Sequence, residues 1–249
     1  MLPNKDEIDY VVVEVSPYQL QSMDNFHPVL AVYPNIEERV IEGRFKTAGE
    51  YIENSLKVLK NLNHENFLIV NFDKLSSNSM LRNSQAQTFW YSRKSFVKMG
   101  VLSEIQGTHF HDKRIHSNIH YHSEFRVSQM RIVGQNNREN LLAAITACKA
   151  LKVSDTSIQT CIEKFPGIPH RMEFVMEKNG VKFYNDAKSE NMDELTETLK
   201  NLKPPIILIA GGRDTEQNYE GYEDIIREKV RLMVLVGECK ENMNRLIGD

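Results

Sequence analysis

The segment VLAVYPNIEERVIEGRFKTAGEYIENSLKVLKNLNHENFLIVN, residues 29–71, decides the fold class of this chain. It begins with the apolar run Val29–Tyr33 and ends with the apolar run Phe67–Asn71, and both patterns are typical of strands. Between them, Ala48–Leu62 places apolar side chains mostly at helical spacing. Strands separated by a helix indicate a parallel, helix-covered sheet, so the sequence predicts an α/β fold.

The residues before this segment supply the first candidate for chemistry, Glu14. Tyr10–Val15 (YVVVEV) predicts a buried strand, and Pro17–Met23 predicts a short helix with Ser16 as its N-cap. A carboxylate near the end of a buried strand is costly unless it binds a metal or a partner. Ligands of α/β proteins bind at the carboxyl ends of parallel strands, which favours a functional role over a place at a sheet rim.

The middle of the chain is less regular. Residues 74–133 mix short β-prone runs with polar segments and are predicted to complete the first domain with small strands and loops. Residues 137–151 and 153–164 predict two helices. Five of the eight histidines fall in His109–His122 (HFHDKRIHSNIHYH). No zinc-type ligand spacing appears there, and the His-x-His alternation favours a solvent-facing strand over a metal site.

A loop with two prolines and one glycine, FPGIPHR at 165–171, marks the predicted domain boundary. The predicted domains are therefore 1–167 and 168–249. In the second, Asn179 and Gly180 separate two strand-like runs, which is a strong hairpin signal. The remaining pattern predicts a helix and two further strands: Asn191–Leu202, Ile206–Ala210 and Arg231–Val236.

Composition and charge exclude several classes of protein. The 249 residues are 41% hydrophobic and 26% charged with a net charge of −3, so neither nucleic acid nor an anionic membrane is predicted as a partner. The longest apolar stretch is too short to span a bilayer, and residues 1–10 lack the features of a secretory signal. We therefore expect a cytoplasmic protein, and three cysteines without paired spacing fit reduced thiols.

Polar residues at element ends are the other candidates. Asn137 and Asn140 open a helix, where they either cap it or hold a nucleotide. Arg171, at the predicted domain junction, suits a phosphate or a surface ion pair. Asp186 and Lys188 are two residues apart at a strand end and reach one ligand from one side, unless they only form a polar turn.

Taken in order, six segments resemble the Mur ligase family. They are EVSPYQL at 14–20, YPNIEE at 33–38, GQNNRENLLAA at 134–144, FPGIPHRMEFV at 165–175, FYNDAKSEN at 183–191 and LIAGGRD at 208–214. Within the family, PHRME and NDAK favour the D-glutamate-adding member. The resemblance implies a central ATP-binding domain without its phosphate-loop part, followed by part of a Rossmann-like C-terminal domain.

The resemblance also implies a reaction of peptidoglycan synthesis. ATP phosphorylates the carboxylate of UDP-N-acetylmuramoyl-L-alanine, and the amine of D-glutamate attacks the acyl phosphate. By carry-over from the family, Glu14 binds Mg²⁺, and Asn137 and Asn140 contact the adenine side of ATP. Arg171 contacts the ribose-phosphate part, Asp186 lies at the nucleotide, and Lys188 lies near the substrates.

This sequence departs from the family pattern at several positions. The 249 residues contain no Gly-x-x-x-x-Gly-Lys-Ser/Thr phosphate loop. Five residues of the family pattern are replaced in this sequence. Val40 and Asn136 stand in place of histidines, and Ser55 stands in place of the carbamylated lysine. Glu190 stands in place of a threonine, and Thr215 stands in place of a lysine. The Glu190 carboxylate is expected to repel D-glutamate, because both are anions.

These departures leave three interpretations of what the chain does. The first is an ATP-dependent ligase by family whose isolated chain is inactive. The second is a non-catalytic descendant that acts as a binding or scaffolding module. The third is one piece of a split ligase, with a partner polypeptide carrying the phosphate loop.

Overall fold

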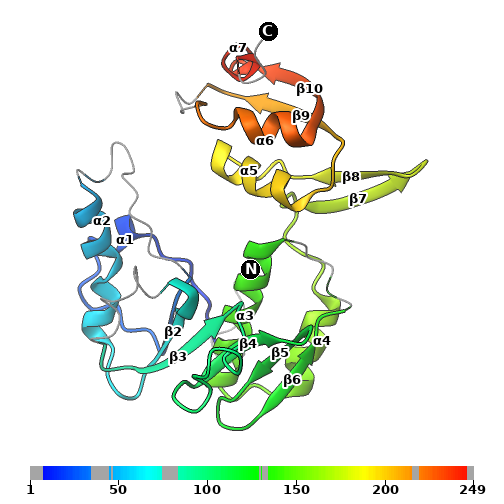
Figure 1. Ribbon diagram of the computed structural model, residues 1–249. Coiled ribbons are helices and arrows are strands. Elements are labelled where there is room, and N and C mark those ends of the chain that lie inside the picture. The colour runs from blue at the N-terminus through cyan, green and yellow to red at the C-terminus, as the bar shows by residue number, and fades with distance from the viewer. Residues whose placement is uncertain are drawn as a thin grey trace. The chain divides into compact units, whose positions relative to one another are not determined.

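The computed structural model describes residues 8–34, 45, 47–74, 84–128, 130, 134–214 and 219–245 (Figure 1). The chain divides into two compact units, Met1–Val127 with Glu139–Gln159, and Ser128–Arg138 with Thr160–Asp249. The predicted boundary between residues 167 and 168 stays a prediction. Among the described helices, none has the length and apolar character needed to cross a membrane.

The first unit is built on one six-stranded sheet, whose strands lie side by side in chain order (Figure 1). The strands are β1 (Leu30–Tyr33), β2 (Phe67–Asn71), β3 (Gln87–Ser92), β4 (Gly107–His111), β5 (Arg114–Ser117) and β6 (Ser123–Arg126). The pairs from β1 to β4 are parallel, and β5 and β6 are antiparallel additions. The α/β fold class is thereby confirmed, and the two apolar runs of residues 29–71 lie in one sheet as predicted.

The first unit contains the helices α1 (Pro17–Leu20) and α2 (Ala48–Ser55), parts of α3 (Gln135–Ala150) and α4 (Asp155–Lys164), and the 3₁₀ turns η2 (Lys57–Asn61) and η3 (Phe72–Lys74). Ser16 and Gln19 form a complete capping box at α1, as the sequence predicts for Ser16. The hydroxyl of Ser154 accepts the Ser157 N–H at 3.2 Å near the start of α4.

The predicted single helix over residues 48–62 is divided in the structure. The side chains of Asn54 and Ser55 donate to the carbonyl oxygens of Glu50 and Tyr51, each at 2.8 Å. Such bonds from a side chain to the preceding turn compete with the regular helix and often bend it. The α-helix ends at Ser55, and the chain continues as the 3₁₀ turn η2.

A hydrophobic core joins β1 and β2 to α1 and η2. Its buried members are Leu20, Ala31, Tyr33, Val58, Leu62, Leu68, Val70 and Ala86. For the members within residues 29–71, burial follows from the strand and helix patterns, which place apolar side chains on one face. This core positions the carboxyl ends of the parallel strands.

The prediction of a buried strand at Tyr10–Val15 is wrong. Residues 11–15 belong to no described strand or helix, and Val12 is 98% exposed. An apolar, β-prone run becomes a strand only when its backbone groups find a partner strand. Within the described part of the sheet, β1 is the edge strand and pairs with β2 alone.

The second unit contains the predicted hairpin. Strands β7 (Glu173–Lys178) and β8 (Val181–Asn185) pair antiparallel. Asn179 and Gly180 both have positive φ, 52° and 77°, as a two-residue hairpin turn of this type requires. The hairpin prediction is confirmed.

The rest of the second unit packs helices against a pair of parallel strands. The elements are α5 (Met192–Asn201), β9 (Ile206–Gly212), α6 (Glu223–Lys229), β10 (Val230–Gly237) and α7 (Lys240–Asn244). One side of the strand pair contacts a small core around Met192, Cys239 and Met243. Gly211 is explained by strand pairing, because a Cβ there would lie 1.8 Å from the carbonyl oxygen of Val236.

Candidate functional site

Two loops of the second unit border an open hollow of about 550 Å³. It is lined by Ile168, Pro169, His170, Ala187, Lys188 and Glu190. The first loop leads into β7 and carries Arg171, and the second follows β8 and carries Asp186. The structure therefore brings three of the predicted site residues into one loop cluster: Arg171, Asp186 and Lys188.

Asp186 holds this loop cluster together. Its Oδ1 accepts the backbone N–H of Met172 at 2.7 Å. Its Oδ2 accepts the hydroxyls of Ser189 and Thr198, each at 2.6 Å. Both carboxylate oxygens are thus engaged by the protein, and Thr198 lies on α5. Asp186 fixes the turn after Arg171 to the end of β8, which is a positioning role.

Arg171 and Lys188 are held by their backbones while their side chains stay exposed. The Arg171 N–H donates to the carbonyl of Ile168 at 3.2 Å, and the Lys188 N–H donates to the carbonyl of His170 at 3.0 Å. His170 and Met172, on either side of Arg171, have φ of 63° and 48°, a strained conformation for residues with side chains. Two cations on one fixed backbone suit an anionic ligand.

His170 was not predicted as a site residue, yet it organises the first loop. Its N–H donates to Glu173 Oε2 at 2.8 Å, and its ring Nδ1 lies 2.9 Å from Asn185 Nδ2. The only sequence signal is its place between Pro169 and Arg171 in the loop motif. Its ring helps to keep the start of β7 beside the end of β8.

Replacing Asp186 with alanine is expected to lower the free energy of unfolding by about 2 kcal/mol, because three hydrogen-bond donors lose a charged acceptor. Urea denaturation measures this loss, and amide exchange at Met172 should accelerate. Asp224→Ala is the matched control, since Asp224 is an exposed carboxylate on α6. Equal stability of the two variants would show that Asp186 does not hold the loops.

Asn137 and Asn140 lie in the first two turns of α3. Their spacing of three residues places them on the same face of the helix. Asn137 is half-buried and Asn140 is exposed. Their assignment to a nucleotide stays a prediction.

A polar network at the carboxyl ends of β2 and β3 was missed from the sequence. Glu139 on α3 pairs with Arg93 Nε at 2.8 Å and accepts from Asn71 at 3.4 Å. Asp73 accepts the Ser92 hydroxyl at 2.6 Å and the Arg93 N–H at 2.7 Å. The available signal was a polar residue, Asn71, closing an apolar strand. The network anchors α3 where α/β proteins bind ligands.

Glu14 does not lie where the sequence predicts it. Its side chain is exposed and belongs to an irregular segment, so the expected burial at a strand end is wrong. Its role as a metal ligand stays a prediction. Ser55 donates its hydroxyl within α2. Val40, Thr215 and the side chain of Asn136 lie outside the described residues.

The histidine-rich segment is only partly solvent-facing. His109 on β4 is 2% exposed, and its ring centroid lies 4.7 Å from that of Phe96. Burial, followed by the neighbouring histidines, lowers the pKa of His109 to about 4. The predicted exposed strand is therefore wrong at this position, because Phe96 covers the ring.

Comparison with known proteins gives one consistent family. The Mur ligase middle domain matches residues 2–148. The UDP-N-acetylmuramoylalanine–D-glutamate ligase of Bdellovibrio bacteriovorus is 32% identical over 248 residues, covering 98% of this chain and 53% of that protein. The chain spans about half the length of the curated relatives it matches.

Solved structures agree with this fold. A structure of MurF from Acinetobacter baumannii has a TM-score of 0.65 at 16% identity, covering 89% of this chain and 49% of that one. MurF ligase from Thermotoga maritima in complex with ADP has a TM-score of 0.51 at 14% identity, covering 84% and 52%. With a family match over more than half of its residues, this chain belongs to the Mur ligase family.

Proposed function

We propose that this chain contributes the nucleotide-binding part of an ATP-dependent ligase that joins D-glutamate to UDP-N-acetylmuramoyl-L-alanine. The observation that carries the proposal is the loop cluster in which Asp186 fixes the turn after Arg171 and Lys188 lines the hollow. The name of the Bdellovibrio bacteriovorus relative supports the choice of amino acid.

The reaction has two steps. The carboxylate of the muramoyl-alanine substrate takes the terminal phosphoryl group of ATP, which releases ADP and gives an acyl phosphate. The amine of D-glutamate attacks the acyl carbon, and the amide forms as phosphate leaves. Such phosphoryl transfer depends mainly on positioning and on neutralising negative charge. The Arg171 guanidinium would grip phosphate oxygens bidentately, and the Lys188 ammonium would act as a point charge.

Glu14 is the proposed protein ligand of Mg²⁺. Its carboxylate is exposed and offers the oxygen atoms that this hard cation prefers. One or two carboxylates together with substrate phosphates commonly suffice for Mg²⁺, so a single residue fits. Asn137 and Asn140 are proposed to hydrogen-bond the adenine through their amide groups. The Mg²⁺ would supply charge neutralisation at the phosphates.

A fusion ligase tests the proposal directly. It joins this chain to the segments of the Bdellovibrio bacteriovorus ligase that lie outside the matched 248 residues. Purified fusion protein is assayed for phosphate release with ATP, Mg²⁺ and UDP-N-acetylmuramoyl-L-alanine, with and without D-glutamate. We expect release that depends on D-glutamate. A folded fusion protein that binds ATP but ignores D-glutamate would contradict the proposed amino-acid substrate.

Replacing Glu190 with threonine is expected to lower the KM of the fusion ligase for D-glutamate about fivefold. The exposed Glu190 lines the hollow beside Lys188, and removing one like charge is worth about 1 kcal/mol. Initial rates at varied D-glutamate measure the change. Glu177→Thr on the hairpin is the matched control, since Glu177 is exposed and lies outside the loop cluster. An unchanged KM would place D-glutamate away from Glu190.

A further inference from the structure

One face of the antiparallel part of the first unit's sheet gathers side chains that bind metals. The strand register places His116 on β5 opposite His109 on β4 and opposite Glu124 on β6. His122 precedes Glu124 by two residues and therefore extends toward the same face. Ile115 and Phe125 point to the other face and are buried. The alternation of the strands thus separates a metal-ligating face from the apolar core.

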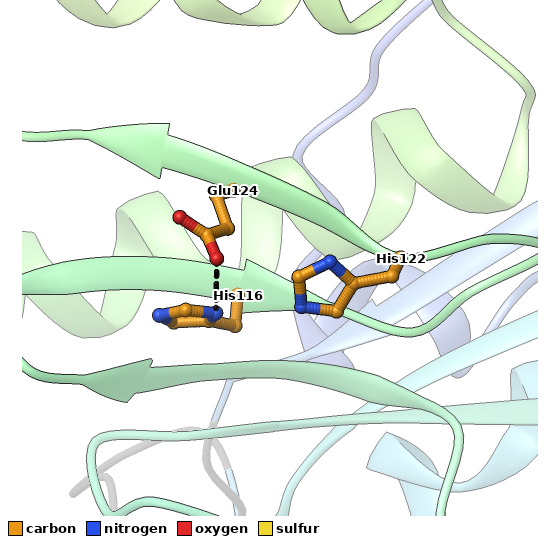
Figure 2. Close-up of side chains that lie close together, drawn as sticks. All are labelled: His116, His122 and Glu124. Carbon is orange, nitrogen blue, oxygen red and sulfur yellow. Dashed lines mark ion pairs between the residues drawn. The ribbon is translucent and has the colours of Figure 1, made fainter.

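Three of these side chains converge. His116 Nδ1 lies 3.6 Å from Glu124 Oε1, and the ring centroids of His116 and His122 are 5.7 Å apart (Figure 2). One ligand atom from each of the three residues lies within 4.8 Å of the other two. The ligands of a tetrahedral zinc ion are about 3.4 Å apart, given metal–ligand bonds of about 2.1 Å. Small side-chain rotations therefore close the triad around one ion.

The surrounding rings leave polar atoms unsatisfied. Both ring nitrogens of His109 are buried and have no hydrogen-bond partner among the described residues. The rings of His109 and His116 stack with centroids 5.7 Å apart. Buried polar atoms are nearly always hydrogen-bonded, and an ion or a water commonly accounts for exceptions. This face is therefore polar and poorly satisfied by protein groups alone.

One carboxylate oxygen of Glu124 stays available to a cation on this face. Arg114 Nη1 donates to Glu124 Oε2 at 2.8 Å, which orients the carboxylate and leaves Oε1 turned toward His116. Arg114 also acts as a partner that holds a ligating carboxylate in place.

We propose that His116, His122 and Glu124 form a binding site for a divalent transition-metal ion, with Zn²⁺ as the best fit. One ring nitrogen from each histidine and Oε1 of Glu124 are the ligands, and a fourth position stays open to water. Two histidines and one glutamate are an established ligand set for zinc. Imidazole donors disfavour Mg²⁺, so the site is separate from the Mg²⁺ of the proposed nucleotide reaction.

Calorimetric titration of the tag-free chain with Zn²⁺ tests the site. We expect one equivalent of Zn²⁺ to bind, and Mg²⁺ at the same concentration should not compete with Zn²⁺ for the triad. His122→Ala and Glu124→Gln should each weaken Zn²⁺ binding at least about tenfold, the loss that outer partners of a metal site alone typically cause. Both side chains are exposed, so the variants are expected to fold, and circular dichroism checks this.

His64→Ala is the matched control, because it removes an exposed imidazole of the same unit outside the triad. This variant should bind Zn²⁺ like the unaltered chain. Co²⁺ supplies a second readout, since a tetrahedral site gives visible ligand-field absorption that His122→Ala should abolish. Zn²⁺ affinity that is unchanged in both triad variants, or lost equally in His64→Ala, would overturn the proposal.

Discussion

Replacing Asp155 with alanine is expected to lower the free energy of unfolding by about 3 kcal/mol, because it leaves a buried ammonium without its counter-ion. Lys149 on α3 is 1% exposed, and its Nζ lies 2.8 Å from Asp155 Oδ1 and 2.8 Å from Ser123 Oγ. The same ammonium lies 3.6 Å from the centroid of the Tyr121 ring. Urea denaturation followed by circular dichroism measures the loss.

A double variant tests how much of this loss comes from leaving the Lys149 ammonium unpaired. The variant Asp155→Ala with Lys149→Met removes the buried ammonium together with its counter-ion. The loss in the free energy of unfolding should therefore be smaller than in Asp155→Ala alone. Partial burial acts to raise the pKa of Asp155, but hydrogen bonds from Lys149 and Ser123 outweigh it and hold that pKa below its usual value. The stabilisation is thus present above about pH 4 and is lost as the pH falls further. Equal losses in the single and double variants would contradict this account.

Replacing Arg171 with alanine is expected to lower the turnover of the fusion ligase about a hundredfold to a thousandfold, the typical cost of removing one preorganised group that stabilises transition-state charge. Arg171→Lys should also be impaired, because an ammonium cannot bind two phosphate oxygens in the bidentate geometry of a guanidinium. The measurements are kcat and the KM for ATP.

Arg227→Ala is the control for this prediction, since Arg227 is an exposed arginine on α6 of the same unit. It should leave turnover unchanged. Asp186→Asn offers a further comparison, because it keeps the shape of the side chain that holds the Arg171 turn while weakening the acceptor. Full turnover in Arg171→Ala would remove Arg171 from the phosphate site.

Local patterns were sufficient for much of the fold. The hairpin at Asn179 and Gly180 follows from two residues that both tolerate positive φ. The parallel pairing of β1 and β2 follows from two apolar runs with a helical pattern between them. In the hairpin the deciding residues are adjacent in the sequence, and in the β1–β2 pair the helical pattern between the two runs indicates parallel strands.

Burial of single residues could not be predicted in the same way, because distant residues decide it. Val12 lies in an apolar, β-prone run, but none of the described strands pairs with it. His109 follows an alternating pattern typical of a wet surface, yet Phe96 from another loop covers it. Lys149 is an ordinary helix residue in the sequence, and its burial is tolerable because Asp155, Ser123 and Tyr121 contact its ammonium.

Sequence motifs predicted which residues belong to the candidate site, and the structure shows what each of these residues contacts. Arg171, Asp186 and Lys188 are the motif residues that the structure brings together. The structure adds a positioning role for Asp186, because Met172 and Thr198 donate to its oxygens, and its place at the nucleotide stays a prediction. Sequence spacing cannot reveal this, since Thr198 reaches Asp186 only through the packing of α5.

The strand pairs of the first unit's mixed sheet differ in the entropy that is lost when the chain between them closes into a loop. In its antiparallel part, Ile115 lies opposite Phe125, so short turns bring the strands together. In its parallel part, Leu30 lies opposite Phe67, and the chain must close a much longer loop first. Because closure entropy grows with loop length and local pairing speeds folding, we expect β1 and β2 to pair later than the antiparallel strands. The strands that carry His116 and Glu124 belong to the part of the sheet that is expected to pair first.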